Sequence, residues 1–193
     1  MSGVGEREKV TQNRVVKLFR DKLNYIYLGN LHDRENSNID EERLKEYLSS
    51  QGYSDELIRR AINSLTDAAK KPDLYYANKE VYSLLRYGAS VRENVSVHNQ
   101  NVKFINWEEP HKNNFYIAEE VTIRGEHTKR PDIVLYINGI AVCVLELKRS
   151  IVSVSEGIRQ NLDNQTDDFI KPFFSTIQLV MAGNDTEGLN RNF

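Results

Sequence analysis

Three charged residues lie at the ends of two apolar runs and could together bind a divalent cation and a phosphate. Asp132 begins the first run, and Glu146 and Lys148 end the second. Between the runs stands Asn138-Gly139, a pair typical of a two-residue β-hairpin turn. Carboxylate oxygens are ligands for hard cations such as Mg²⁺, and a nearby ammonium favours an anionic oxygen. The pattern therefore predicts a hydrolytic cation site at the open end of a hairpin.

Strand geometry decides whether these three side chains meet. Successive side chains point to opposite faces of a sheet, so Glu146 and Lys148 share a face. A strict two-residue turn would pair Asp132 with Leu145 and place it on the other face. A three-residue loop, 138–140, with a bulge would instead place Asp132 opposite Glu146. Facing carboxylates repel each other unless a cation lies between them. We therefore predict an odd-length connection or a bulge in this hairpin.

The same residues also have a simpler interpretation. Charged residues make up 28% of the chain, so this spacing can arise by chance, and charges at strand ends are usually a solvated rim. The hairpin context and the shared face favour the cation site.

Pro131-Asp132 followed by Glu146-Leu147-Lys148 resembles the motif of the PD-(D/E)xK nucleases, in order and on the expected strands. This resemblance implies that Asp132 and Glu146 bind Mg²⁺ through their carboxylates, with the Leu147 carbonyl as a further ligand. It also implies that Lys148 positions the attacking water and favours its hydroxide form. Metal activation of water and in-line displacement at a phosphate make chemical sense of that set of residues.

The similarity extends along nearly the whole chain. Five segments resemble the amino-terminal endonuclease domain of the type I restriction enzyme R subunit. They are TQNRVVKLF, YIYLGNL, DRENSNID, LLRYGASV and RPDIVLYINGIAVCVLELK. The resemblance implies cleavage of double-stranded DNA in a complex with methylation and specificity subunits. It also implies an ATP-dependent translocase after this domain. The sequence has no Gly-x-x-x-x-Gly-Lys-[Ser/Thr] phosphate loop. We therefore expect this chain to be a fragment that lacks the translocase, and we expect ATP to be used only in the translocase.

A second family element lies on the helix after the hairpin, where the family tends to carry Gln-x-x-x-Tyr. Gln160 matches the Gln, and the resemblance implies a contact with a DNA phosphate or with metal-bound water; an exposed polar residue is the simpler alternative. Asn164 stands where the family has Tyr, and Gln165 could substitute in part. A helix carboxylate sometimes completes the metal site in this fold, and Glu80 and Glu8 are the candidates.

The net charge of −2 bears on how DNA would be bound. Affinity for nucleic acid usually comes from basic side chains that neutralise phosphates. Either the basic residues cluster on one face, or most of the binding is supplied from outside this chain, which is the option we favour. Lys129, Arg130 and Arg149 flank the motif and could contact phosphates or simply aid solubility.

Composition excludes several classes of protein. A single Cys cannot form a disulfide framework, and no Cys/His cluster has zinc-ligand spacing. The sequence shows no signal peptide and no apolar run long enough to span a membrane. We therefore expect a cytoplasmic protein without a membrane partner.

Apolar periodicity predicts helices first, then an antiparallel meander, a crossover helix and a closing strand. The helices are expected over 1–23, 40–48, 55–70, 73–87 and 155–169, and the strands over 25–31, 89–97, 102–107, 115–124, the hairpin 131–148 and 176–182. The order of elements predicts one α/β domain over 1–193, with a mixed central sheet flanked by helices. The resemblance implies that this domain is a nuclease with a restriction-endonuclease-like core. A helical subregion, about 39–71, is inserted near the N-terminus, and the catalytic core covers about 72–183.

Three functions fit this sequence. The first is a Mg²⁺-dependent DNA endonuclease domain of a type I restriction enzyme. The second is a non-catalytic docking module of the same complex. The third is a stand-alone exonuclease with the same motif, which would act only from DNA ends.

Overall fold

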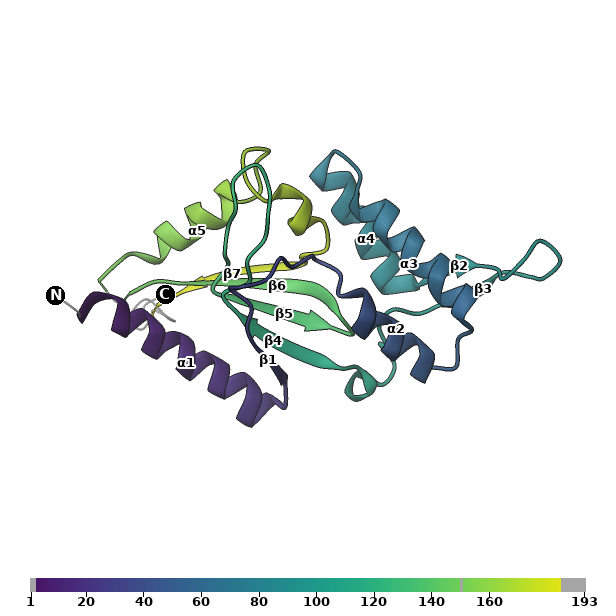
Figure 1. Ribbon diagram of the computed structural model, residues 1–193, viewed down its shortest axis with the longest axis horizontal. Helices are drawn as coiled ribbons and strands as arrows, with labels where there is room; N and C mark the ends of the chain where they lie inside the picture. The colour runs from purple at the N-terminus through teal and green to yellow at the C-terminus, as the bar shows by residue number, and fades with distance from the viewer. Residues whose placement is uncertain (1–2, 150, 185–193) are drawn as a thin grey trace, which may run out of the picture.

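The computed structural model describes residues 3–149 and 151–184, with side chains from Lys9 on. A five-stranded sheet in the order β1-β4-β5-β6-β7 forms its centre (Figure 1). The antiparallel meander β4-β5-β6 is extended by β1, parallel to β4, and by β7, parallel to β6. The predicted mixed sheet is confirmed. Its strands are β1 (Ile26–Asn30), β4 (Phe115–Glu119), β5 (Ile133–Ile137), β6 (Ile140–Leu147) and β7 (Leu179–Gly183).

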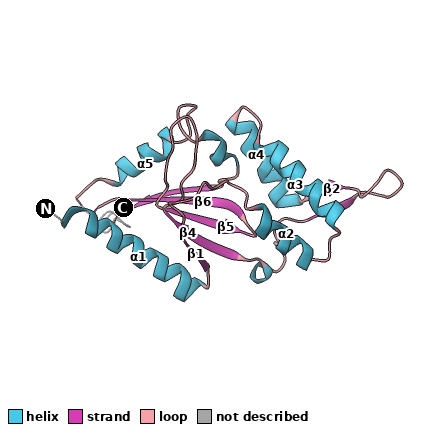
Figure 2. Ribbon diagram, in the orientation of Figure 1, coloured by secondary structure: helices cyan, strands magenta, loops and turns pink. Residues whose placement is uncertain are grey.

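Two helices cover opposite faces of this sheet (Figure 2). α1 (Gly3–Leu23) lies on one face, where Val16 packs against Ile133 and Leu135. α5 (Val154–Asp163) connects β6 to β7 across the other face. Gly157 lets α5 approach closely, because a Cβ there would lie 3.1 Å from the Cβ of Ala182. The side chains of β6 that face α5 are therefore held beneath a helix.

The helical subregion groups at one end of the sheet (Figure 1). The predicted span 39–71 contains α2 (Glu41–Ser50) and α3 (Asp55–Ala69). Beyond that span, α4 (Leu74–Tyr87) and a small sheet of β2 (Ala89–Val91) and β3 (Gln100–Val102) share the same hydrophobic core. Asp40 and Ser54 cap α2 and α3, as expected, by accepting from backbone N–H groups of the first turn. Ile140, at the start of β6, belongs to the core of this subregion. The subregion thus packs onto the hairpin turn.

The hairpin contains the predicted bulge, but at a different position. Asn138 and Gly139, with φ of 52° and 91°, form a regular two-residue turn, so the expected three-residue loop is wrong. The register instead shifts further along: Tyr136 pairs with Ala141, but Leu135 pairs with Cys143. The extra residue is Val142.

Neighbouring segments on β6 explain where the bulge forms. The Ala141 N–H donates to the Asn38 carbonyl, and the Val142 carbonyl accepts from the Gln178 N–H. Backbone groups displaced from the ladder therefore find partners in two other parts of the chain. Past the bulge, Ile133 pairs with Leu145, and the same register carried one residue further places Asp132 beside Glu146.

Several predicted elements are shorter than expected, because polar side chains bind the backbone at their ends. The strand over 89–97 ends at Val91, and Asn94 Oδ1 accepts from the Ser96 N–H in the turn that follows. The helix over 155–169 ends at Asp163, whose carbonyl accepts from both the N–H and the Oγ1 of Thr166.

The expected strands over 102–107 and 115–124 also differ. Of the stretch 102–107, only Val102 belongs to a strand, at the end of β3. The rest is a loop, because Asn113 Oδ1 accepts from the Asn106 N–H and Asn113 Nδ2 donates to the Asn106 carbonyl. The second ends at Glu119, since Glu120 turns the chain with a φ of 51°. β2 and β3 pair only with each other, so they do not join the meander.

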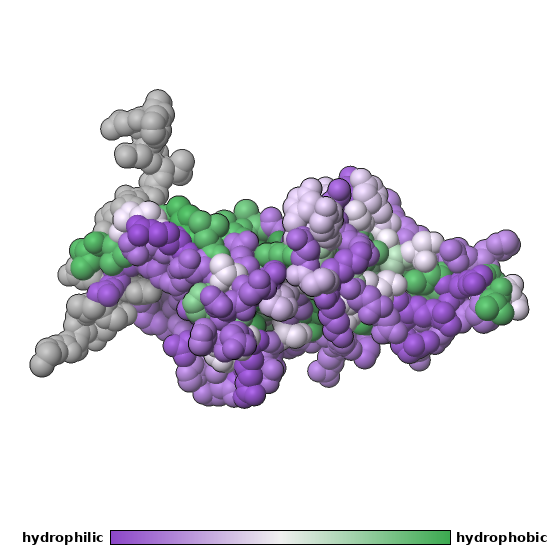
Figure 3. Space-filling model, turned by 90° about the horizontal axis from the view of Figure 1, so that it is seen from above, coloured by the Kyte–Doolittle hydropathy of each residue, from purple (hydrophilic) through white to green (hydrophobic). Residues whose placement is uncertain are grey.

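Hydrophilic residues dominate the face seen in Figure 3, in keeping with a chain that is 28% charged. The right-hand end of that view, where the loop between β2 and β3 lies (Figure 1), carries a small apolar spot. Val95 in this loop is 82% exposed. Among the described residues, no helix combines the length and the apolar character needed to cross a bilayer.

Candidate active site

The carboxylate of Asp132 is fixed where β5 begins. Its Oδ2 accepts a 2.6 Å hydrogen bond from the backbone N–H of Leu147 on the neighbouring strand. The Asp132 carbonyl accepts from the Glu120 N–H at 2.9 Å and from Gln12 Nε2 at 3.3 Å. Contacts on both sides of the residue therefore set the direction of its side chain.

Glu146 lies on β6 beneath α5 and is 1% exposed. One carboxylate oxygen, Oε1, accepts a hydrogen bond from Nε2 of Gln160 and lies 3.6 Å from Lys148 Nζ. The other oxygen, Oε2, is buried and has no hydrogen-bond partner among the residues that the structure describes. Buried polar atoms are almost always paired, so an unpaired carboxylate oxygen marks a place where a ligand is expected.

Lys148 shares that face of β6, and its side chain is only 17% exposed. Its Nζ donates a 2.6 Å hydrogen bond to Gln160 Oε1. The carboxamide of Gln160 thus connects the acid and the base of the motif, donating to one and accepting from the other. The structure brings Asp132, Glu146, Lys148 and Gln160 together, as the motif spacing requires.

Burial and a second carboxylate act together on Glu146. Desolvation is the larger cause and the charge of Asp132 the next, and together they raise the pKa of Glu146 to about 8; Lys148 acts in the opposite direction. A cation at this point would reverse the effect, because it stabilises both carboxylates in their ionised form. Glu146 is therefore a buried acid held close to a second carboxylate.

The donor set is suited to Mg²⁺. Within residues 3–149 and 151–184, no group of three or more His, Cys, Asp or Glu side chains could hold a metal. Mg²⁺ is usually bound by one or two carboxylates, with waters and substrate phosphates completing its shell. Asp132, Glu146 and the unpaired Oε2 fit that mode. Leu147 turns its side chain into the core on the opposite face, and its carbonyl remains a predicted ligand.

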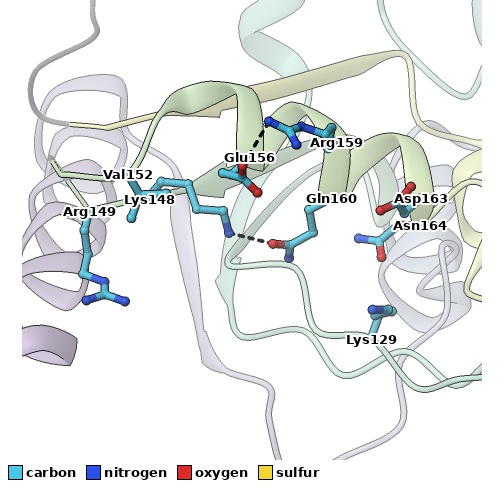
Figure 4. Close-up of a pocket in the computed structure, with 9 residues that line it drawn as sticks. All are labelled: Lys129, Lys148, Arg149, Val152, Glu156, Arg159, Gln160, Asp163 and Asn164. Atoms are coloured by element: carbon cyan, nitrogen blue, oxygen red, sulfur yellow. Dashed lines mark hydrogen bonds and ion pairs between the residues drawn. The ribbon is translucent and has the colours of Figure 1, made fainter.

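A cleft of about 830 Å³ opens beside these residues (Figure 4). Lys148 and Gln160 form part of its wall, and four of its lining side chains are basic against two acidic ones. Its lining comprises Lys129, Lys148, Arg149, Val152, Glu156, Arg159, Gln160, Asp163 and Asn164. A chain with a net charge of −2 therefore still presents a locally basic surface next to the paired acids.

Other candidates from the sequence lie elsewhere. Glu80 lies on α4, where it forms an ion pair with Lys71, and it does not line the cleft. Gln165 does not line the cleft either, and its Nε2 donates to the Asn161 carbonyl. Arg130 pairs with Glu120 at 2.9 Å. The side chain of Glu8 lies outside the described residues.

A second buried carboxylate, Glu119, was not foreseen. It lies at the end of β4 with 5% exposure, on the face covered by α1. Its oxygens accept from Lys9 Nζ at 2.8 Å, Gln12 Nε2 at 2.8 Å and Tyr27 Oη at 2.5 Å. Gln12 also donates to the Asp132 carbonyl, so this cluster is joined to the backbone of Asp132 from the face of the sheet that α1 covers. Its partners are distant in sequence, so no local pattern indicates it.

Fold and site together define an α/β protein with a nuclease-like core. Residues 5–189 match the family model described as the type I restriction enzyme R protein N terminus, and the chain belongs to that family. Two proteins of Methanocaldococcus jannaschii are similar to part of it. One is assigned as the endonuclease subunit of the type I restriction enzyme MjaVIIIP, 34% identical over 98 residues, which is 50% of this chain and 9% of the relative. The other is assigned to MjaIXP, 29% identical over 101 residues, 49% of this chain and 10% of the relative. The matched region thus spans about a tenth of these relatives.

Proposed function

We propose that this chain is the nuclease domain of a type I restriction enzyme and hydrolyses phosphodiesters in double-stranded DNA with the help of Mg²⁺. The observation that carries the proposal is the unpaired, buried Oε2 of Glu146 beside Asp132. Family membership supports the same reading, because both relatives are named as endonuclease subunits. The methylation and specificity subunits of such an enzyme are the proposed protein partners.

Each side chain has a definite part in this proposal. Asp132 and Glu146 hold the cation, and the Leu147 N–H keeps the Asp132 carboxylate turned toward it. When bound, Mg²⁺ would activate the attacking water and offset the charge that builds on the phosphate. Lys148, aimed by Gln160, places an ammonium beside the reacting phosphate and favours the ionised form of the attacking water.

Cleavage is proposed to be independent of base sequence. Base recognition needs an element that enters a groove of the duplex and contacts base edges. The cleft beside Lys148 instead offers charged side chains suited to the phosphate backbone. Selection of the DNA site would then belong to the specificity subunit.

A plasmid assay tests the proposal. Supercoiled DNA is incubated with Mg²⁺ and a high concentration of wild-type protein, Asp132→Ala or Lys148→Ala. Lys45→Ala serves as a charge-matched control, because Lys45 lies on α2 and pairs with Glu41. We expect nicking by the wild type and the control only. Equal nicking by all four proteins would indicate a contaminant and would favour the docking module.

The exonuclease alternative is separated by the form of the DNA. A stand-alone exonuclease acts from ends, so it would degrade linear DNA and leave covalently closed circles intact. Nicking of closed circles by the wild type, lost in Asp132→Ala, supports the endonuclease.

A further inference from the structure

The wall of the cleft opposite Lys148 carries a second cation, Lys129. Its Nζ lies 4.0 Å from the centroid of the Phe169 ring. No carboxylate in the described part of the chain forms an ion pair with it. A cation–π contact holds an ammonium in place without neutralising its charge. Lys129 therefore retains its full positive charge for a ligand in the cleft.

The loop that carries Lys129 is anchored. Ile123 and Lys129 exchange two backbone hydrogen bonds, of 2.9 and 3.0 Å, and the His127 N–H donates to the Asp168 carbonyl. Gly125 packs so tightly against the segment after α5 that a Cβ there would lie 1.9 Å from the Phe169 carbonyl oxygen. Backbone contacts therefore fix the position of Lys129, unlike that of an ordinary surface lysine.

Asn164 supplies a second, independent observation. It lines the same cleft and is 1% exposed, and neither Oδ1 nor Nδ2 of its carboxamide has a hydrogen-bond partner among the described residues. Its backbone is held on both sides, because its N–H donates to the Gln160 carbonyl and its carbonyl accepts from the Ile170 N–H. A phosphate has no proton to give Oδ1, so it would pair with Nδ2, the donor of this fixed carboxamide.

Figure 4 shows how these groups are arranged. Gln160 lies between Lys148 on one side and the pair Asn164 and Lys129 on the other. Besides Arg149 and Arg159, the cleft thus has two lysine positions, separated by the carboxamide that orients Lys148. Phosphates repeat along a nucleic acid strand, so a strand with one phosphate at Lys148 would present the next one further along the cleft.

We propose that Lys129 and Asn164 form a second phosphate subsite, which binds the phosphodiester adjacent to the one that is cleaved. Lys129 neutralises that phosphate, and the Asn164 carboxamide donates to one of its oxygens from Nδ2. The inference rests on the proposed function, since it assumes that a DNA strand occupies the cleft. It adds a binding site for the uncleaved part of that strand, which fixes its register over the two acids.

The test measures how the affinity of the 193-residue chain for a short labelled DNA duplex depends on salt, by fluorescence anisotropy in Ca²⁺. Each phosphate neutralised contributes about 0.9 to the slope of log K against log salt. We expect Lys129→Ala and Lys129→Gln each to lower the slope by about that amount, and Lys129→Arg to keep it. Asn164→Ala is expected to weaken binding without a change in slope, because it removes no charge.

Controls make the outcomes distinct. Lys45→Ala, which removes an equal charge on α2, is expected to keep the wild-type slope. If both neutral variants at 129 fold, as judged by their thermal melting, and keep the wild-type slope while the wild type nicks plasmid, the subsite is wrong and the nuclease stands. If the wild type neither binds the duplex nor nicks plasmid, the proposed function and the subsite fall together.

Discussion

Lys148 Nζ donates a 2.6 Å hydrogen bond to Oε1 of Gln160, so the lysine of the candidate site, directly after β6, is oriented by a residue of α5. The same carboxamide donates to Glu146 from its other end. A helix that crosses between two strands thereby orders two side chains of the strand beneath it. The contact also shows why an amide is suited to this position: only a group with both a donor and an acceptor satisfies an acid and an ammonium together.

Replacing Gln160 should therefore affect activity far more than stability. We expect Gln160→Ala to lower the rate of Mg²⁺-dependent nicking by about tenfold to a hundredfold, the usual cost of losing a residue that orients a metal-site side chain. Gln160→Glu should be worse, because it adds a third carboxylate beside Glu146. Rates are measured on supercoiled plasmid. A Gln160→Ala variant as active as the wild type would show that Lys148 needs no help from α5.

Glu146 should destabilise the protein in the absence of a cation. Its Oε2 is buried without a hydrogen-bond partner in the described part of the chain, and Asp132 repels it. We expect Glu146→Gln to raise the free energy of unfolding by about 1–3 kcal/mol in metal-free buffer. Added Mg²⁺ should raise the melting temperature of the wild type only, by preferential binding to the folded state. Equal Mg²⁺ shifts in the two proteins would locate the cation elsewhere.

Glu119 should matter for stability. Its carboxylate is buried and accepts from Lys9, Gln12 and Tyr27. We expect Glu119→Ala to lower the free energy of unfolding in urea by about 2–4 kcal/mol, because three donors lose their acceptor. Glu108 is the matched control: it forms an exposed ion pair with Lys103, and Glu108→Ala should leave the urea midpoint unchanged.

Gly125 should tolerate no side chain. The Cβ of Gly125→Ala would meet the Phe169 carbonyl oxygen at 1.9 Å, so the loop of Lys129 must move away. We expect a loss of about 1–3 kcal/mol in stability, typical of overpacking, measured by thermal unfolding. Gly183→Ala, where a Cβ would meet nothing within 4 Å, provides the comparison. Equal melting temperatures for the two variants would contradict the tight packing of this loop.

The single cysteine offers a pH-dependent test. Burial raises the pKa of the Cys143 thiol from 9.0 to about 11. Well below pH 9 the thiol is protonated in both the folded and the unfolded state, so its ionisation does not change the stability there. Between pH 9 and 11 only the unfolded state releases the proton, so stability falls as the pH rises. We expect Cys143→Ala to remove this part of the fall in urea midpoint, and a wild type with the same pH profile as the variant would contradict the buried thiol.

Local sequence was sufficient for most of the helices and for the site strands. The caps at Asp40 and Ser54 are short-range signals, and each forms as expected. Asn138-Gly139 also turns the chain, but as a two-residue turn and not as part of a three-residue loop. We predicted an odd-length connection or a bulge because Asp132 must lie on the same face as Glu146, and the hairpin contains a bulge. Its position could not be read from the hairpin, because it depends on Asn38 and Gln178, which bind the displaced backbone from outside.

Other features depend on contacts between distant parts of the chain. Glu119 ends an ordinary apolar strand, and only the fold brings α1 and β1 around it. Asn164 appeared in the sequence only as a departure from the family pattern, and its place in the cleft follows from where α5 ends. Lys129 could be noticed as basic, but its contact with Phe169 depends on how two loops pack.

The extra residue at Val142 gives the hairpin a rule of parity. Insertions or deletions within either strand between the two acids preserve their common face only in even numbers, whereas a single one must be offset by the loss or gain of an irregularity. Related chains should therefore vary in strand length by two residues, or by one where a regular ladder replaces the kink. Alignments of such domains can be checked by that count before any coordinates exist.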